Sequence, residues 1–444
     1  MRLLTVLSAL VLASSAQAQT ATNETARYLE TVRNDPSLVL AFLREMPKGA
    51  DLHNHLSGAI YAESFIEWGA ASGACIRLSD YVAVRAPCDS TSQPPLANAL
   101  RNEDLRNRII DQWSMRNWRP ERESGHDHFF AAFSKFSAAG DGRSGDYLAE
   151  EVSRAASDRL SYVELMWTGG TAPDTASAGV RAMIERKNTL LGCGTPNAAP
   201  GCRVEVRFLY QVLRGLPIDL VRRMIITGFQ LSSSDPNFVG LNLVMPEDCR
   251  VCMRDFSQHM AIIDSLHAVY PNVKTTLHAG ELWPGLVPPE GLRFHIRESV
   301  EKGHARRIGH GVAVMHEDRA IELLREMARR DVAVEICLTS NAVILGVSGK
   351  EHPLATYLKY GVPVLLATDD QGVSRSDMTL EFKRAVEDQH LGYRTLKKMV
   401  QNSIKYSFAQ EPVKQRLLKK LGEDFAAFES KWRVFDIPTT RTDR

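Results

Sequence analysis

The sequence predicts a (β/α)8 barrel with a helical insertion after its first strand. Eight short apolar segments recur along the 444-residue chain, and stretches with helical spacing separate most of them. Such alternation indicates parallel strands that are buried on both faces. A doubly wound open sheet is the rival fold, but no GxGxxG motif follows the first strand. The expected strands lie at 50–56, 160–167, 204–213, 238–244, 274–279, 307–312, 332–338 and 363–368.

Helices are expected before, between and after these strands. Residues 19–35 are polar, and we expect them to form a loose lead-in to a helix over 36–46. The long gap between the first two strands contains a charged helix near 99–118, and we interpret about 70–125 as an insertion that decorates the barrel. Residues 19–444 would then form one barrel domain ending in a polar tail. Helical spacing also marks 257–269, 319–330, 351–359 and much of 380–432.

Composition and charge restrict the partners. The net charge is only +1, and no polybasic run is present. Nucleic-acid and membrane-surface binding both draw on clustered basic residues, so neither is expected here. A nucleoside-sized ligand remains compatible with this composition.

The N-terminus has the pattern of a secretory signal peptide. Arg2 precedes an apolar run over 3–13, and Ser-Ala-Gln-Ala follows at 15–18. A basic start, a short apolar region and an A-x-A site are typical of a leader that is cleaved, here after Ala18. The apolar run is too short to span a bilayer. We therefore expect export to the periplasm or the medium.

The cysteines agree with export, because six of the seven form local pairs. In an oxidising compartment such pairs indicate short-loop disulfides. A zinc knuckle built from the four cysteines between 193 and 252 is the alternative, but its spacing would be irregular. Cys337 lies in an apolar run and is expected to be a buried free thiol. The expected pairs are Cys75 with Cys88, Cys193 with Cys202, and Cys249 with Cys252.

Polar residues interrupt the apolar runs near the ends of four expected strands. In a (β/α)8 barrel the C-terminal ends of the strands meet at one mouth, where catalytic groups collect. These residues are His53 and His55 on the first strand, His278 and Glu281 at the fifth, His310 on the sixth, and Asp369 and Asp370 at the eighth.

Four of these residues predict a metal site. Side chains alternate along a strand, so His53 and His55 point to the same side. With His278 and Asp369 they make a set of three imidazoles and one carboxylate, which suits one catalytic Zn²⁺ ion per chain with a water in the remaining position. Bound zinc lowers the pKa of such a water. The fourth strand, 238–244, contains no lysine that could bridge two metals, which favours a mononuclear site.

The other polar residues are candidates for proton transfer and binding. Glu281 is placed to act as a proton shuttle, although a carboxylate at a helix start is the alternative. His310 could orient or deprotonate the attacking water, or it could be a hydrogen-bonded core histidine. Asp370 must point differently from Asp369 and could contact a substrate.

Five motifs resemble the adenosine deaminase family of the amidohydrolase superfamily. They are MPKGADLHNHLSGA (46–59), HAGE (278–281), RIGHG (307–311), LTSNAVILG (338–346) and ATDD (367–370). The lead-in at 46–49 and the leader resemble the secreted, growth-factor-related branch.

The resemblance implies zinc-dependent deamination of adenosine, and of 2′-deoxyadenosine, to inosine and ammonia. It also implies the metal set given above. Glu281 would protonate purine N1, His310 would assist the attacking hydroxide, and Asp370 would hydrogen-bond N7.

Three positions depart from the family pattern and bear on the substrate. Ser57 stands where an acidic residue often contacts the ribose 5′-hydroxyl, Met245 replaces a glycine whose N–H meets purine N3, and Gln371 replaces a common proline. A serine would not repel a phosphate, so a 5′-nucleotide or an N6-substituted nucleoside is an alternative substrate. A nucleoside-binding protein without activity is a third hypothesis, which the intact set of polar residues disfavours.

Overall fold

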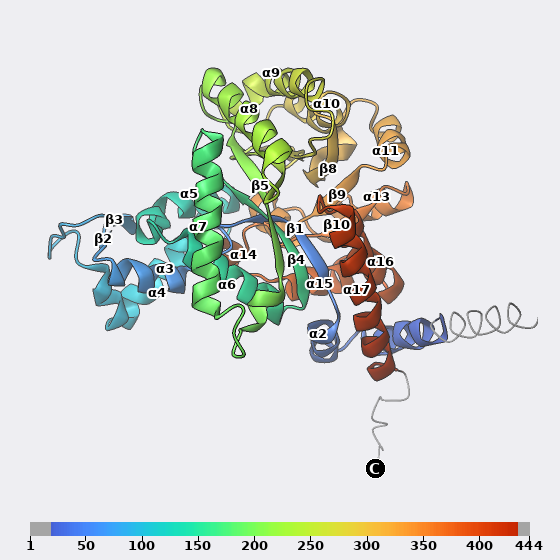
Figure 1. Ribbon diagram of the computed structural model, residues 1–444, viewed down its shortest axis with the longest axis horizontal. Helices are drawn as coiled ribbons and strands as arrows, with labels where there is room; N and C mark the ends of the chain where they lie inside the picture. The colour runs from blue at the N-terminus through green and yellow to red at the C-terminus, as the bar shows by residue number, and fades with distance from the viewer. Residues whose placement is uncertain (1–18, 434–444) are drawn as a thin grey trace, which may run out of the picture.

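Eight parallel strands curl into the predicted barrel (Figure 1). The computed structural model describes residues 19–433, so the expected leader at 1–18 and the tail from 434 onward lie outside it. Every expected strand is present, with ends that differ by at most two residues. In barrel order the strands are β1 (Gly49–His55), β4 (Leu160–Trp167), β5 (Glu205–Leu213), β6 (Phe238–Val244), β7 (Thr275–Ala279), β8 (Ala305–His310), β9 (Ala333–Ile336) and β10 (Val364–Leu366).

The barrel closes through the residues just beyond β10. The amide of Asp369 donates to the carbonyl of His53 at 2.9 Å, and the amide of His55 donates to the carbonyl of Asp369 at 3.2 Å. Asp369 takes a left-handed backbone conformation, with φ 59°. A non-glycine residue held there is strained by roughly 1–3 kcal/mol and needs firm support from its surroundings. The backbone closure of the barrel therefore involves three of the predicted metal ligands, His53, His55 and Asp369.

Helices surround the barrel, and a continuous apolar core fills the space between them and the strands. The stretches with helical spacing at 257–269, 319–330 and 351–359 overlap three of these helices, α9 (Arg250–His267), α11 (Ala320–Arg329) and α13 (Leu354–Lys359). The helices are α2 (Pro36–Glu45), α3 (Ala62–Ala71), α4 (Glu103–Trp113), α5 (Gly125–Phe136), α6 (Ser144–Ser157), α7 (Pro173–Leu191), α8 (Ile218–Ser234), α9 (Arg250–His267), α10 (His295–Glu301), α11 (Ala320–Arg329), α12 (Leu338–Leu345), α13 (Leu354–Lys359), α14 (Gln371–Ser374), α15 (Met378–Glu387), α16 (Tyr393–Lys405) and α17 (Glu411–Lys431).

The expectation of a loose lead-in over 19–35 is wrong, because residues 19–32 are helical. Tyr28, Leu29 and Val32 are buried, and their spacing places them on one face of this helix. The Tyr28 ring lies 5.1 Å from the ring of Trp432, beside the end of α17. Packing against the C-terminal helix thus outweighs the polar character of the segment, a long-range contact that local composition does not reveal.

The segment between β1 and β4 carries the insertion, which projects to one side of the barrel in Figure 1. The insertion is longer than the expected 70–125, because it runs from α3 through α4 to α5. It also contains a two-stranded antiparallel sheet of β2 (Cys75–Arg77) and β3 (Val82–Val84), which was not predicted. An apolar cluster that includes Phe65, Trp113 and Phe129 of the insertion extends to Ile344 of α12 and Val373 of α14. Helix α5 of the insertion packs against α12 of the barrel. The insertion is thereby fixed beside the barrel mouth.

The cysteines pair as predicted. Disulfides join Cys75 to Cys88, Cys193 to Cys202, and Cys249 to Cys252. Cys337 is a buried free thiol. A zinc knuckle is therefore wrong, because its four cysteines are bonded to one another. Within residues 19–433, no helix combines the length and apolar character that crossing a bilayer requires.

Candidate active site

Five of the seven predicted polar residues line one pocket at the C-terminal ends of the strands, and the other two, His53 and His310, lie beside them. The pocket measures about 280 Å³. Its walls include the end of β1, the turn after β7, the residues after β10, and helix α5 of the insertion. The residues that line it are His55, Ser57, Phe129, Phe130, Phe133, Gln211, Leu213, Val244, Met245, Pro246, His278, Glu281, Asp369 and Asp370.

Four side chains at this mouth form a candidate metal centre. The Nε2 atom of His278 lies 3.1 Å from Nε2 of His53 and 3.2 Å from Nε2 of His55. Oδ1 of Asp369 lies 3.4 Å and 3.3 Å from the same two nitrogens. Nitrogen and oxygen atoms that each bind one metal ion at about 2.0–2.2 Å are about 3.0–3.6 Å apart. The spacing therefore fits one metal ion enclosed by all four groups.

The proton positions of the three histidines also fit a metal. Each Nδ1 atom faces an oxygen acceptor and donates to it, which leaves the Nε2 lone pair free to bind a cation. The three pairs are His53 with Glu335 at 2.7 Å, His55 with Gln211 at 3.2 Å, and His278 with Asn242 at 3.0 Å.

Sequence reasoning missed these three supporting residues. Each is a polar residue in a mostly apolar strand, Gln211 in β5, Asn242 in β6 and Glu335 in β9. The same signal identified the metal ligands, and it could have identified these residues too. Glu335 is itself bound by the buried Arg307, whose other partner is Glu164. A chain of buried charges therefore runs from the metal centre into the barrel.

Glu281 lies at the pocket wall beside the metal centre, in the turn after β7. The carboxylate of Glu247 holds this turn by accepting from the amides of Gly280 at 2.9 Å and Glu281 at 2.7 Å. Burial, together with the nearby carboxylates of Asp369 and Glu247, raises the pKa of Glu281 well above its ordinary value. Such a carboxyl keeps its proton at pH values where an exposed one has lost it, so it is suited to donate a proton. Glu281 is therefore not a carboxylate that caps a helix, because no helix starts there.

Two glycines leave room for the side chains of Asp370 and His53. A Cβ atom on Gly58 would lie 1.6 Å from Oδ1 of Asp370, and a Cβ atom on Gly309 would lie 2.6 Å from Cε1 of His53. The Oδ1 atom of Asp370 lies beside Gly58, and burial raises the pKa of the Asp370 carboxyl well above the ordinary range. His310 lies with its Nε2 atom 3.7 Å from Oε1 of Glu281. Burial lowers the pKa of His310 to about 3.

Met245 keeps the backbone conformation of a glycine. Its φ is 90°, a region that L residues rarely adopt. Its Sδ atom accepts from the amide of Gly215 at 3.3 Å, and its side chain lines the pocket. A glycine would adopt this φ without strain, and the methionine side chain contributes apolar surface to the pocket wall.

The free energy of unfolding of Met245→Gly is expected to exceed that of Met245→Ala by about 1 kcal/mol, because both variants lose the side chain and its contact with Gly215 but only alanine keeps the strained φ. Relief of backbone strain contributes roughly 1–3 kcal/mol. The greater flexibility of glycine in the unfolded chain offsets about 0.5–1 kcal/mol of this gain. Denaturant unfolding measures the difference, with Met245→Ala as the matched control, because alanine removes the same side chain and keeps the strain. If the glycine variant were no more stable than the alanine variant, the backbone of Met245 would not be strained.

The aromatic wall of the pocket comes from the insertion and was not predicted. Phe129, Phe130 and Phe133 all lie on α5 and face the pocket. The insertion is held against the opposite wall by His126, whose Nε2 lies 3.0 Å from Oδ1 of Asp248 in the loop after β6. No pattern in the sequence connects residue 129 with the strand ends. Only the docking of the insertion brings these rings to the mouth.

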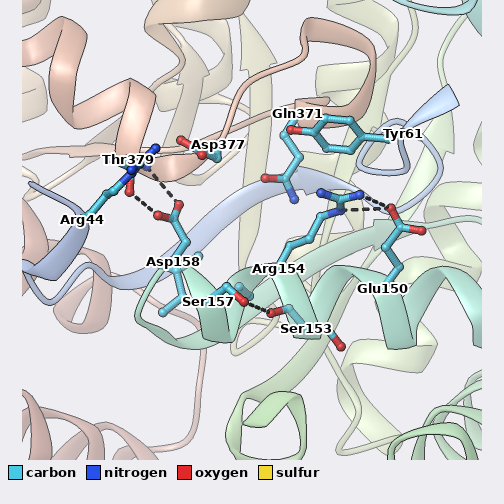
Figure 2. A pocket seen from close by; sticks show the side chains of 12 residues that line it. Arg44, Tyr61, Glu150, Ser153, Arg154, Ser157, Asp158, Gln371, Asp377 and Thr379 are labelled. Carbon is cyan, nitrogen blue, oxygen red and sulfur yellow. Dashed lines mark hydrogen bonds and ion pairs between the residues drawn. The ribbon is translucent and has the colours of Figure 1, made fainter. Parts of the chain in front are cut away.

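Gln371 belongs to a different pocket. Figure 2 shows it among the residues that line a second hollow of about 530 Å³, beside Tyr61 and Arg154. Its amide donates to Glu151 at 2.5 Å. The Arg154 guanidinium stacks on Tyr61 at 3.9 Å and pairs with Glu150, so its charge is already neutralised. The replacement of proline by Gln371 therefore does not change the lining of the pocket at the barrel mouth.

A (β/α)8 barrel that gathers three histidines and an aspartate at its strand ends is typical of the amidohydrolase superfamily. The family model for adenosine deaminase matches residues 144–424. The adenosine deaminase of Salmonella typhimurium is 30% identical over 288 residues, which cover 62% of this chain and 75% of that protein. The chain therefore belongs to the adenosine deaminase family.

Two further comparisons set the extent of the similarity. The adenosine deaminase of Clostridium perfringens is 28% identical over 211 residues, which cover 47% of this chain and only 60% of that protein. The N6-methyl-AMP deaminase of Arabidopsis thaliana shares the fold, with a TM-score of 0.62 at 20% identity over 86% of this chain and 98% of that one. The likeness to the Arabidopsis structure supports the barrel and leaves the substrate to be argued from the pocket.

Proposed function

We propose that this protein is a zinc-dependent hydrolase that converts adenosine to inosine and 2′-deoxyadenosine to 2′-deoxyinosine, with release of ammonia. One observation carries the proposal. A metal donor set, His53, His55, His278 and Asp369, shares a pocket with two buried carboxyls whose pKa values are raised, Glu281 and Asp370. A binding protein without activity has no need for a metal centre beside a buried proton donor.

Each residue has a distinct task in this reaction. When bound, zinc lowers the pKa of a water molecule toward neutrality. Glu281 holds a proton at the pocket wall and can give it to a ring nitrogen, purine N1, which makes C6 easier to attack. Asp370 has a buried oxygen, Oδ1, without a partner among the described residues. With its proton retained, the Asp370 carboxyl can donate to N7, which is a hydrogen-bond acceptor. One water is consumed, and one ammonia leaves.

The pocket lining favours a nucleoside over a nucleotide. No lysine or arginine is among the described residues that line it, whereas three carboxyl groups are. Ser57 removes the carboxylate that would repel a 5′-phosphate, but nothing at the pocket wall would pair with the phosphate charge. The three phenylalanines of α5 and Met245 instead offer apolar contacts. We therefore place an uncharged sugar in this pocket.

Relative rates on a substrate panel test the proposal. Zinc-loaded protein is mixed with adenosine, 2′-deoxyadenosine, AMP, adenine or N6-methyladenosine, and the ultraviolet shift of the purine is followed. AMP is expected to have a kcat/KM on the order of 100-fold below that of adenosine, because the described part of the lining offers no lysine or arginine to pair with the phosphate, and an unpaired buried charge costs several kcal/mol. Preference for AMP or for N6-methyladenosine would overturn the substrate assignment. No turnover of any compound would overturn the enzyme assignment.

We also propose that the protein is exported and belongs to the secreted branch of the family. The leader pattern at 1–18 supports export, and the three disulfides suit an oxidising compartment. Mass spectrometry of the protein recovered from the periplasm or the medium should find a chain that starts at Gln19. Retention of the leader in a cytoplasmic protein would contradict export.

A further inference from the structure

A buried chain of hydrogen bonds leads from a backbone amide to His310. The amide of Leu354 donates to Nδ1 of His352 at 3.2 Å. Nε2 of His352 lies 3.1 Å from Oδ1 of Asn341, and Nδ2 of Asn341 lies 3.0 Å from Nδ1 of His310. His352, Asn341 and His310 are almost completely buried, with exposed fractions of 2%, 0% and 0%. Burial therefore keeps water from replacing the hydrogen-bond partners of these three side chains.

The amide of Leu354 fixes the direction of every bond in this chain. A ring nitrogen that accepts a hydrogen bond carries no proton, so the one proton of His352 is on Nε2. Nε2 then donates, and the atom of Asn341 that faces it must be the carbonyl oxygen. The amide nitrogen of Asn341 therefore faces His310 and donates to Nδ1.

The consequence is a single tautomer of His310. Because Nδ1 accepts from Asn341, the ring proton is on Nε2. Nε2 is buried, has no hydrogen-bond partner among the described residues, and lies 3.7 Å from the Glu281 carboxylate. The His310 ring is also 4.8 Å from the ring of His53 and 5.1 Å from that of His278. An N–H group is thereby directed at the metal centre.

We propose that His352 is a positioning residue, which acts through Asn341 to hold the proton of His310 on Nε2, so that His310 serves the reaction as a hydrogen-bond donor and not as a base. This inference rests on the proposed function, because it needs reacting atoms beside His310. His352 itself touches neither the pocket nor the metal ligands. Of the two roles that the sequence left open for His310, orienting the water agrees with this tautomer, and removing its proton does not.

The test compares two uncharged replacements of similar size. His352→Gln keeps an N–H group for Oδ1 of Asn341, whereas His352→Leu does not, so the Asn341 amide is free to turn over. His352→Leu is expected to lower kcat on adenosine on the order of 10-fold with little change in KM. This loss is part of the roughly 100- to 1000-fold that complete removal of such a donor costs. His352→Gln is expected to restore most of kcat. Equal kcat in the leucine variant and the wild type would overturn the proposal.

A second readout does not depend on activity. In protein with nitrogen-labelled histidine, NMR shows which ring nitrogen of His310 carries the proton, with the His310→Gln variant identifying its signals. The proton is expected on Nε2 in the wild type and in His352→Gln, whereas His352→Leu is expected to contain a mixture of the Nε2–H and Nδ1–H tautomers. A proton on Nδ1 in the wild type would overturn the inference even if the protein deaminates adenosine. If the spectrum is as expected but the protein deaminates none of the purines, the hydrogen-bond chain from Leu354 to His310 is supported and the proposed function is wrong.

Discussion

Glu281→Gln is expected to lower turnover of adenosine by about 100- to 10,000-fold, the range that a positioned proton donor contributes. Glutamine has the shape of the protonated carboxyl and still offers N–H groups, so binding should change little. It cannot give up a proton to purine N1. Because Glu281 is not among the four clustered donors, the metal content should stay at one ion per chain.

Glu381→Gln is the matched control for this variant. Glu381 is also fully buried, and burial raises its pKa to about 8, but it lies on α15 and accepts from the amide of Thr339. The control should retain turnover. Steady-state kinetics with elemental analysis measures both variants. If Glu281→Gln kept most of its activity, Glu281 would not be the proton donor.

His278→Ala is expected to remove the metal, and all measurable turnover with it. His278 provides the nitrogen that lies nearest to both of the other imidazoles. Loss of a residue that merely supports a ligand costs about 10- to 100-fold in metal affinity, so loss of a ligand should cost more. Elemental analysis after dialysis against a weak chelator measures the occupancy. Zinc in excess should restore little activity.

His259→Ala provides the comparison for His278→Ala. His259 is a fully buried histidine on α9 that lies outside the metal cluster, so its loss makes a similar cavity without touching the metal ligands. The expected result is a destabilised protein that still holds one metal ion. Full occupancy in His278→Ala would exclude His278 from the ligand set, whereas metal loss in both variants would point to a general effect of the cavity.

The barrel could be predicted because its strands are continuous apolar runs. Val364–Leu366 and Phe238–Val244 are buried almost throughout, and no amphipathic helix produces such a pattern. The N-terminal helix at 19–32 could not be predicted, since its stability depends on Trp432 at the far end of the chain. The short strands β2 and β3 were missed for a similar reason: three residues each give too little periodicity.

The metal ligands could be predicted because the C-terminal ends of barrel strands converge regardless of the length or conformation of the loops. The sequence alone therefore places His53, His278 and Asp369 close together. The phenylalanines of α5 were missed, because the position of an insertion depends on its packing against α12 and not on strand order. The tautomer of His310 could not be predicted from the sequence, because it depends on Leu354 through three hydrogen bonds.

The most direct test is a product balance on adenosine with purified protein that holds one zinc ion per chain. Each adenosine consumed is expected to yield one inosine and one ammonia, and the yield is expected to fall to zero when the zinc is removed. Folded, zinc-loaded protein that leaves adenosine unchanged would contradict the proposed function, and so would full activity in protein shown to contain no metal.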